Sequence, residues 1–247
     1  MASEYLGFIS DNDFLNHVRR MMGRLTRTID LASFEKNVID PIKLLFSAKA
    51  YNQTIEEVIR VEVARQLGKT MENMIGAFHQ DIFRYVKGCE VPEDGVDVLC
   101  PGRQIYAELK NKHNTMNSSS AEKVFEKLKG IVVGNPRATA YLVEVIAKQS
   151  QDIPWAVPGA QLQKGKAERV RRISIDRFYQ LITGDDMAFC KLCKALGPAI
   201  DKVLETTPSM EMKDTVLQEL KARDSNILRG IFKTTFSSYL GFETFGR

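Results

Sequence analysis

The first part of the chain carries apolar residues at the three- and four-residue spacing of amphipathic helices. In the segment 11–25 five residues share this spacing: Phe14, Val18, Met21, Met22 and Leu25. His17 looks like an exposed position of that helix. Thr54 opens a Thr-x-x-Glu capping box that ends at Glu57, ahead of a long helical segment that reaches Tyr85. We therefore expect residues 1–85 to be mainly helical.

The pattern changes to a period of two in the next part of the chain. The segments VDVLC (96–100) and QIYAELKNK (104–112) alternate apolar and polar residues, and the Pro101-Gly102 pair between them is typical of a turn. This pattern predicts a β-hairpin. A serine-capped helical pattern follows in residues 118–133, and TAYLVEVIAK (139–148) is an apolar run typical of a buried strand.

Together these elements predict an α/β fold with a mixed β-sheet core made of a hairpin, a crossover helix and a further strand. Residues 149–172 are rich first in Pro and Gly and then in Lys and Arg, and they look like a long exposed loop before a short strand. We expect a single domain over residues 1–247. Its parts would be a helical region (1–85), a catalytic α/β core (90–175) and a helical C-terminal part (176–247).

Three charged residues of the hairpin fall on one face. Glu108 and Lys110 share a face because residues i and i+2 of a strand point the same way. A two-residue loop would pair Asp97 with residue 106, and a four-residue loop would pair it with Glu108. Both registers keep Asp97 on the face of Glu108 and Lys110, as a direct or a diagonal neighbour.

This grouping predicts a metal site. Two carboxylates that face each other across a hairpin repel unless a cation lies between them, and carboxylate oxygens are ligands that Mg²⁺ prefers. A nearby lysine can hold a water or stabilise developing negative charge, so the three residues could together hydrolyse a phosphodiester. The alternative is an exposed hairpin face with surface ion pairs. The central position of the strands favours the metal site.

Composition narrows the class of protein only a little. The chain has 247 residues, 44% of them hydrophobic and 27% charged, with a net charge of +4. This is ordinary globular composition, compatible with nucleic-acid binding. We find no signal-peptide pattern, no membrane-length apolar run and no disulfide framework among four cysteines, so we expect a cytoplasmic protein. Cys190 and Cys193 lack the second ligand pair of a zinc site. No Gly-rich phosphate loop or G-x-S-x-G elbow is present.

The hairpin resembles a known nuclease signature. The segments VDV and YAELKNK resemble the pattern of the PD-(D/E)XK nucleases, although Val96 stands where the full pattern has proline. Three further segments resemble type II restriction endonucleases that cut GGNCC-type or GGWCC-type sites. They are ENMIGAFHQDIF, ELKNKHNTMNSSS and RRISIDRFYQLITGDDMAF. The resemblance spans about Met71 to Phe189.

This resemblance implies a fold, a reaction and partners. It implies a restriction-endonuclease-like domain that acts as a homodimer on double-stranded DNA with Mg²⁺, cuts at a GGNCC-like palindrome and leaves 5′-phosphates. Asp97 and Glu108 would bind the metal, Lys110 would assist the attacking water, and Glu72 matches a position that often carries a further acid. A cognate methyltransferase would be expected in the host. A central A/T preference stays open.

Two polar segments are candidates for DNA contact. The first follows the hairpin and contributes four candidates: Lys112, His113, Asn114 and Asn117. The second lies in the basic run QKGKAERVRR and contributes five: Lys164, Lys166, Arg169, Arg171 and Arg172. Such side chains bind phosphates and base edges. The alternatives are a polar loop that caps the next helix and a solvated charge run.

Other functions remain compatible with these residues. One is a nuclease of the same fold that recognises DNA structure or repair intermediates, and another is a DNA-binding protein without catalytic activity. A third is an enzyme unrelated to DNA, for which no salt-dependent DNA binding would be expected.

Overall fold

The computed structural model describes residues 5–25, 28–114, 116–157, 167–206 and 212–242. The chain divides into two compact units. Unit 1 comprises residues 1–23 and 74–208, and unit 2 comprises residues 24–73 and 209–247, so that the boundary falls within one long helix. The single-domain organisation expected from the sequence stays a prediction.

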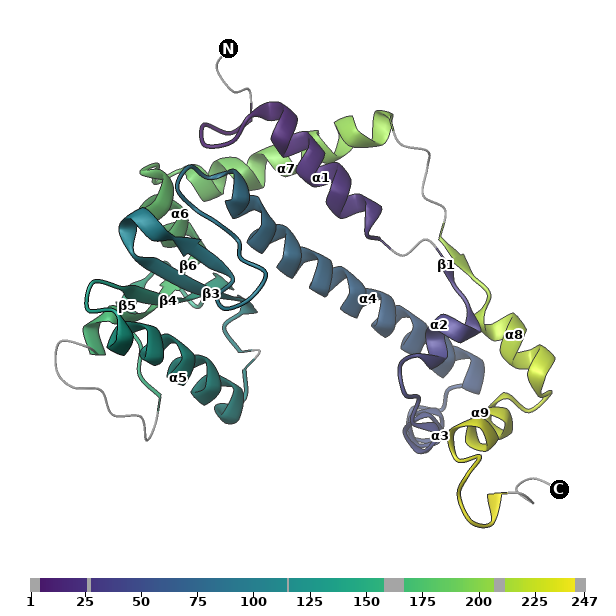
Figure 1. Cartoon of the computed structure of the whole chain (residues 1–247). Coiled ribbons are helices and arrows are strands. Elements are labelled where there is room, and N and C mark those ends of the chain that lie inside the picture. Colours follow the sequence, from purple (N-terminus) through teal and green to yellow (C-terminus); the bar gives the residue numbers. More distant parts are fainter. Residues whose placement is uncertain (1–4, 26–27, 115, 158–166, 207–211, 243–247) are drawn as a thin grey trace. The chain divides into compact units, whose positions relative to one another are not determined.

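The core of unit 1 is a five-stranded mixed sheet (Figure 1). Its strands, in chain order, are β2 (Val98–Cys100), β3 (Ile105–Lys112), β4 (Thr139–Ile146), β5 (Asp152–Pro154) and β6 (Val170–Ser174). Their order across the sheet is β2-β3-β4-β6-β5. The central strands β3, β4 and β6 are parallel, and both edge strands are antiparallel to their neighbours. The parallel pair β3 and β4 therefore needs a crossover connection, and the helix in residues 118–134 supplies it.

Helices cover both faces of this sheet (Figure 1). The helical elements of unit 1 are α1 (Asp11–Gly23), the end of α4 (Ile55–Asp81), η1 (Ile82–Tyr85), η2 (Pro101–Arg103), α5 (Ser118–Gly134), η3 (Ala167–Arg169), α6 (Ile175–Thr183) and α7 (Ala188–Glu205). Helix α5 packs Phe125 and Leu128 against Leu142 on one face. Helices α1, α6 and α7 share a core with Val143 and Ile173 on the other face.

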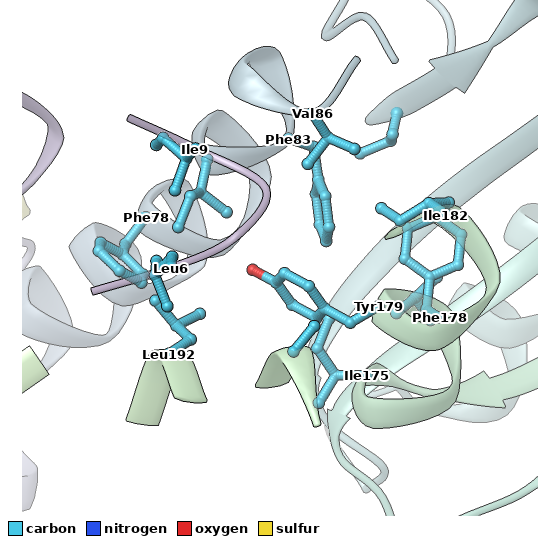
Figure 2. Packing of buried hydrophobic residues seen from close by; sticks show 14 of the residues in the cluster. Leu6, Ile9, Phe78, Phe83, Val86, Ile175, Phe178, Tyr179, Ile182 and Leu192 are labelled. Carbon is cyan, nitrogen blue, oxygen red and sulfur yellow. The ribbon is translucent and has the colours of Figure 1, made fainter. Parts of the chain in front are cut away.

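The second of these cores is rich in aromatic residues (Figure 2). The ring of Phe83 lies 5.3 Å from that of Phe178 and 5.0 Å from that of Tyr179, measured between centroids. All three side chains are fully buried. Such aromatic clusters contribute large buried areas and thereby fix the sheet against its helices.

Unit 2 is mainly helical. It contains α2 (Leu31–Glu35), α3 (Pro41–Ala50), the first part of α4, α8 (Val216–Arg223), α9 (Ile227–Thr235) and a parallel pair of two-residue strands, β1 (Thr28–Ile29) and β7 (Lys213–Asp214). Pro41 occupies the first turn of α3, where its missing N–H is tolerated, and Asp40 caps that helix. Phe34, Ile59 and Val216 are fully buried in the core of this unit.

The fold class expected from the sequence is confirmed, as are most helices of residues 5–85. The capping box is present, since the N–H of Thr54 donates to Glu57 at 2.7 Å and the N–H of Glu57 donates to Thr54 Oγ1 at 3.2 Å. The expectation for His17 is wrong. Its ring is fully buried and lies 3.1 Å from the carbonyl oxygen of Phe78.

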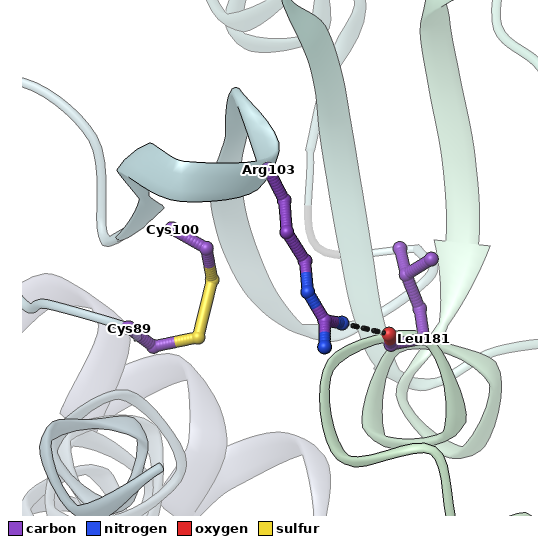
Figure 3. The surroundings of a disulfide bond; sticks show 4 residues. All are labelled: Cys89, Cys100, Arg103 and Leu181. Atoms are coloured by element: carbon purple, nitrogen blue, oxygen red, sulfur yellow. Dashed lines mark hydrogen bonds between the residues drawn. A yellow bond between two sulfur atoms is a disulfide. The ribbon is translucent and has the colours of Figure 1, made fainter. Parts of the chain in front are cut away.

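The sequence shows no disulfide framework, but the structure contains a disulfide. Cys89 and Cys100 form one, which ties the segment before the hairpin to the end of β2 (Figure 3). Close beside it, Arg103 donates a hydrogen bond to the carbonyl of Leu181. The cysteines therefore no longer support the expectation of a reducing compartment. Within the described residues, no helix combines the length and the apolar character that crossing a membrane requires.

Candidate active site

The hairpin register brings Asp97 opposite Glu108. The pairing runs from Cys100 with Ile105 to Val98 with Ala107, and one further step in the same register joins Asp97 to Glu108. The connection is the four-residue one, which closes through Gln104 in a left-handed conformation with φ of 53°. Of the two registers left open by the sequence, the direct pairing is therefore the correct one.

A backbone contact anchors the Asp97 carboxylate against β3. Its Oδ2 accepts a hydrogen bond from the N–H of Leu109 at 2.7 Å. Leu109 lies between Glu108 and Lys110 in β3, so the three charged residues predicted from the sequence lie together. Glu108 is buried at 6% exposure, whereas Asp97 and Lys110 are half-buried. One face of the hairpin therefore carries the acids and the lysine, and Leu109 packs into the core of the other face.

Burial dominates the electrostatics of Glu108. Removal from water raises the pKa of this carboxyl, and the negative charge of Asp97 raises it further. The hydrogen bond from Lys127 and the charges of Lys127 and Lys110 act in the opposite direction, but the net pKa stays raised. A buried carboxylate next to a second carboxylate is the arrangement that a divalent cation would relieve.

Lys127 is a residue that the sequence analysis missed. It lies on α5, and its Nζ donates hydrogen bonds both to Glu108 Oε1 and to the carbonyl oxygen of Gly95. Its neighbour Leu128 is fully buried against the sheet. The signal in the sequence is faint, because a lysine beside an apolar helix position is common and only the packing of α5 reveals its partner.

Glu144 is the second residue that was missed. It is the one charged residue in the apolar run of β4, and it lies beside Lys110 in the parallel register. Glu144 is fully buried and accepts a hydrogen bond from Arg172 on β6. The same guanidinium lies 3.4 Å from the carbonyl oxygen of His113. A lone acid in an otherwise apolar strand was a usable signal, because such residues are rarely buried without a partner.

The donor set of this site fits Mg²⁺. Magnesium is usually held by one or two carboxylates, and water and substrate phosphates complete its octahedral shell. Asp97 and Glu108 supply these two carboxylates. Among the described residues there is no group of three or more His, Cys, Asp or Glu that could hold a metal. Two carboxylates therefore suit a weakly held hard ion whose remaining ligands are water or other oxygens, and they do not match an all-protein zinc cage.

The first group of DNA-binding candidates lies at the end of β3 and directly after it. Lys112 ends β3, and His113 donates its backbone N–H to the carbonyl of Ile146 at 3.0 Å. Asn114 is exposed. Asn117 is the N-cap of α5, since its side chain accepts a hydrogen bond from the N–H of Ser120 at 2.8 Å. DNA contact by these residues stays a prediction, and the capping role of Asn117 is compatible with it.

Of the five residues in the second group, the structure describes three. Lys164 and Lys166 lie outside the described residues. Arg169 donates to the carbonyl of Ala138 at 3.0 Å, and Arg171 donates to Asp152 at 2.6 Å, while Arg172 binds Glu144. All three arginines therefore have partners within the protein. DNA contact by the five residues of this group stays a prediction.

Glu72, the further acid expected from the resemblance, lies on α4 in unit 2 and is exposed. Its role also stays a prediction.

Comparison with known proteins identifies similar chains. A family model described as Eco47II restriction endonuclease matches residues 6–205, a range that contains the whole sheet. The type II restriction enzyme Sau96I of Staphylococcus aureus is 28% identical over 261 aligned residues, which cover 98% of this chain and 100% of that enzyme. The type II restriction enzyme Eco47II of Escherichia coli is 33% identical over 215 residues, which cover 81% of this chain and 88% of that enzyme.

Proposed function

The chain belongs to the Eco47II restriction endonuclease family, and on that premise we propose that it cuts double-stranded DNA at a specific site with Mg²⁺. The observation that carries the proposal is the anchoring of Asp97 to the backbone of β3 between Glu108 and Lys110. Two acids and a lysine in this arrangement match the nuclease signature seen in the sequence. The enzyme class is type II site-specific deoxyribonuclease.

Each of the three charged residues would have its own role in phosphodiester hydrolysis. Asp97 and Glu108 would hold Mg²⁺, which supplies positive charge against the phosphate and lowers the pKa of a bound water. Lys110 would orient the attacking water and stabilise the negative charge that develops on the phosphate oxygens. Attack in line with the 3′-oxygen breaks the bond from phosphorus to that oxygen. The products would be a 5′-phosphate and a 3′-hydroxyl.

Site recognition is proposed from the family resemblance. A GGNCC-like palindrome read by a homodimer would place one active site on each strand, because the symmetry of the protein matches that of the DNA. The polar candidates after β3 and the basic candidates from Lys164 to Arg172 would contact phosphates and base edges. A cognate methyltransferase would protect the host DNA, and both enzymes would act in the cytoplasm, where that DNA is found.

The test is digestion of a sequenced plasmid by the purified full chain with Mg²⁺, followed by mapping of the ends. Discrete fragments with 5′-phosphates at one palindrome support the proposal, and Glu108→Gln serves as the inactive control. Smearing, or cleavage confined to branched DNA, would indicate a structure-specific or repair nuclease. Salt-dependent binding with no cleavage under any divalent cation would indicate a DNA-binding protein without catalytic activity.

A further inference from the structure

We infer that Lys127 is the built-in counter-ion of the Asp97–Glu108 pair, which holds the site together without metal and is displaced when a divalent cation binds. The inference rests on the proposed function, because it assigns a new positioning residue to the same metal site. It concerns a residue outside the acid, acid and lysine signature.

One ammonium group joins the two segments that carry the acids. Lys127 Nζ donates to Glu108 Oε1 on β3 and to the carbonyl oxygen of Gly95, two residues before Asp97. An ammonium with three donors suits such a bridge, since each bond takes one proton. Lys127 therefore places a positive charge on Glu108 and ties β3 to the loop that leads to Asp97.

The two partners differ in their freedom to move. The Lys127 side chain is 41% exposed, whereas that of Glu108 is only 8% exposed. A lysine can swing its charged end into water on its flexible stem, but the buried carboxylate has no such route. The lysine would therefore leave when a divalent cation arrives. A metal at Glu108 and an ammonium hydrogen-bonded to the same carboxylate would repel each other strongly.

A neighbouring lysine shows that the contact is specific to the site. Lys129 lies on the same helix and pairs with Glu126 at 3.0 Å, three residues away, in an ordinary helical ion pair. Lys127 instead reaches a residue on the sheet and a backbone carbonyl in the loop before β2. Lys129 is therefore a matched control. It carries the same charge on the same helix, but its ion pair is with Glu126 and not with Asp97 or Glu108.

The experiment measures Mn²⁺ binding to the full-length protein by calorimetry, without DNA. Lys127→Met is expected to bind Mn²⁺ about tenfold more tightly than wild type, because no ammonium has to be displaced. It is also expected to melt at a lower temperature than wild type in metal-free buffer and to recover when Mn²⁺ is added. Lys129→Met is expected to match wild type in Mn²⁺ affinity, and Glu108→Gln is expected to lose the binding.

The outcomes separate this inference from the proposed function. If wild type binds Mn²⁺ through Glu108 and Lys127→Met binds it equally or more weakly, the counter-ion role is overturned and the metal site stands. If neither wild type nor Lys127→Met binds Mn²⁺, the counter-ion role is overturned, and the plasmid digestion with Mg²⁺ decides the proposed function separately. Should Lys127→Met not fold, Lys127→Arg keeps the charge and is expected to bind Mn²⁺ no more tightly than wild type. Tighter binding by this variant would overturn the role.

Discussion

Arg172 donates a hydrogen bond to Glu144 across two neighbouring strands, and Glu144 lies directly beside Lys110 of β3. Glu144 is fully buried, whereas the Arg172 side chain is 28% exposed. The hydrogen bond goes to Glu144 Oε1, and among the described residues Glu144 Oε2 has no hydrogen-bond partner. The charge of Arg172 is therefore the main compensation for burying this carboxylate in a sheet.

Replacing Arg172 by methionine is expected to lower the free energy of unfolding by about 3 kcal/mol, because a buried charge then lacks its partner. Urea denaturation measures the loss. The double variant Arg172→Met with Glu144→Gln should recover part of it, since the uncompensated charge is gone. Arg171→Met is the control, and its partly exposed pair with Asp152 should contribute about 1 kcal/mol or less. Equal losses in both single variants would contradict the special role of the pair.

The sequence predicted the face of the hairpin but left its register open. Alternation by two residues puts Asp97, Glu108 and Lys110 on one face in both registers. The choice of register depends on the turn, where Gln104 adopts a left-handed conformation that residues other than glycine rarely take. No local sequence pattern predicts a left-handed conformation at such a position. Local periodicity therefore located the acids and the lysine, while the direct pairing of Asp97 with Glu108 required the structure.

Contacts between distant segments were harder to predict than the elements themselves. The strand β5, within the expected long loop, is a three-residue edge strand, too short for a periodic pattern, and it contains Pro154, which an edge tolerates. The disulfide depends on how close Cys89 and Cys100 come in space, which cysteine spacing does not give. Lys127 reaches Glu108 only because α5 packs on that face. In each case the information lies in tertiary packing.

The raised pKa of Glu108 predicts an unusual dependence of stability on pH. Below the ordinary glutamate pKa of 4.5, both the folded and the unfolded chain keep this proton, and stability is unaffected. As pH rises through 4.5, the unfolded chain loses the proton first, so stability falls until the raised pKa of the folded chain is passed and then stays at that lower value. Glu108→Gln should therefore melt at a higher temperature than wild type at pH 7 in metal-free buffer.

Thermal melts at pH 4 and pH 7 check this prediction. The difference between Glu108→Gln and wild type should shrink toward zero at pH 4. Glu126→Gln is the control, because its carboxylate is half exposed on the surface of α5 and forms a surface ion pair with Lys129. A difference of the same size at both pH values would show that burial of the charge is not its cause.

Reduction of the Cys89–Cys100 disulfide is expected to destabilise the protein. The bond closes a short loop with a sequence separation of 11 residues, and this loop contains Asp97. Loop-closure entropy gives a contribution of about 3 kcal/mol for a loop of this size. Urea denaturation with and without a reductant should show this loss in wild type and in Cys190→Ser, but not in Cys89→Ser. A reductant effect that persists in Cys89→Ser would assign it to another group.

Lys110 and Lys112 allow chemistry and binding to be separated on one strand. They lie two residues apart in β3 and share a face, but only Lys110 adjoins both the acids and Glu144. We expect Lys110→Ala to lower the cleavage rate by about 10²- to 10⁴-fold, since it removes the group that orients water. Its affinity for DNA should stay within about threefold of wild type, because one phosphate contact at most is lost.

Lys112→Ala is expected to show the opposite pattern. If Lys112 binds a phosphate, its loss should weaken DNA binding and reduce the slope of log affinity against log salt by about 1, while the rate at saturating DNA changes little. Single-turnover cleavage and salt-dependent binding measurements on both variants separate the two roles. Equal loss of binding in both variants would make Lys110 another phosphate contact. A fully active Lys110→Ala would remove it from the reaction, and the two acids alone would then have to account for the hydrolysis.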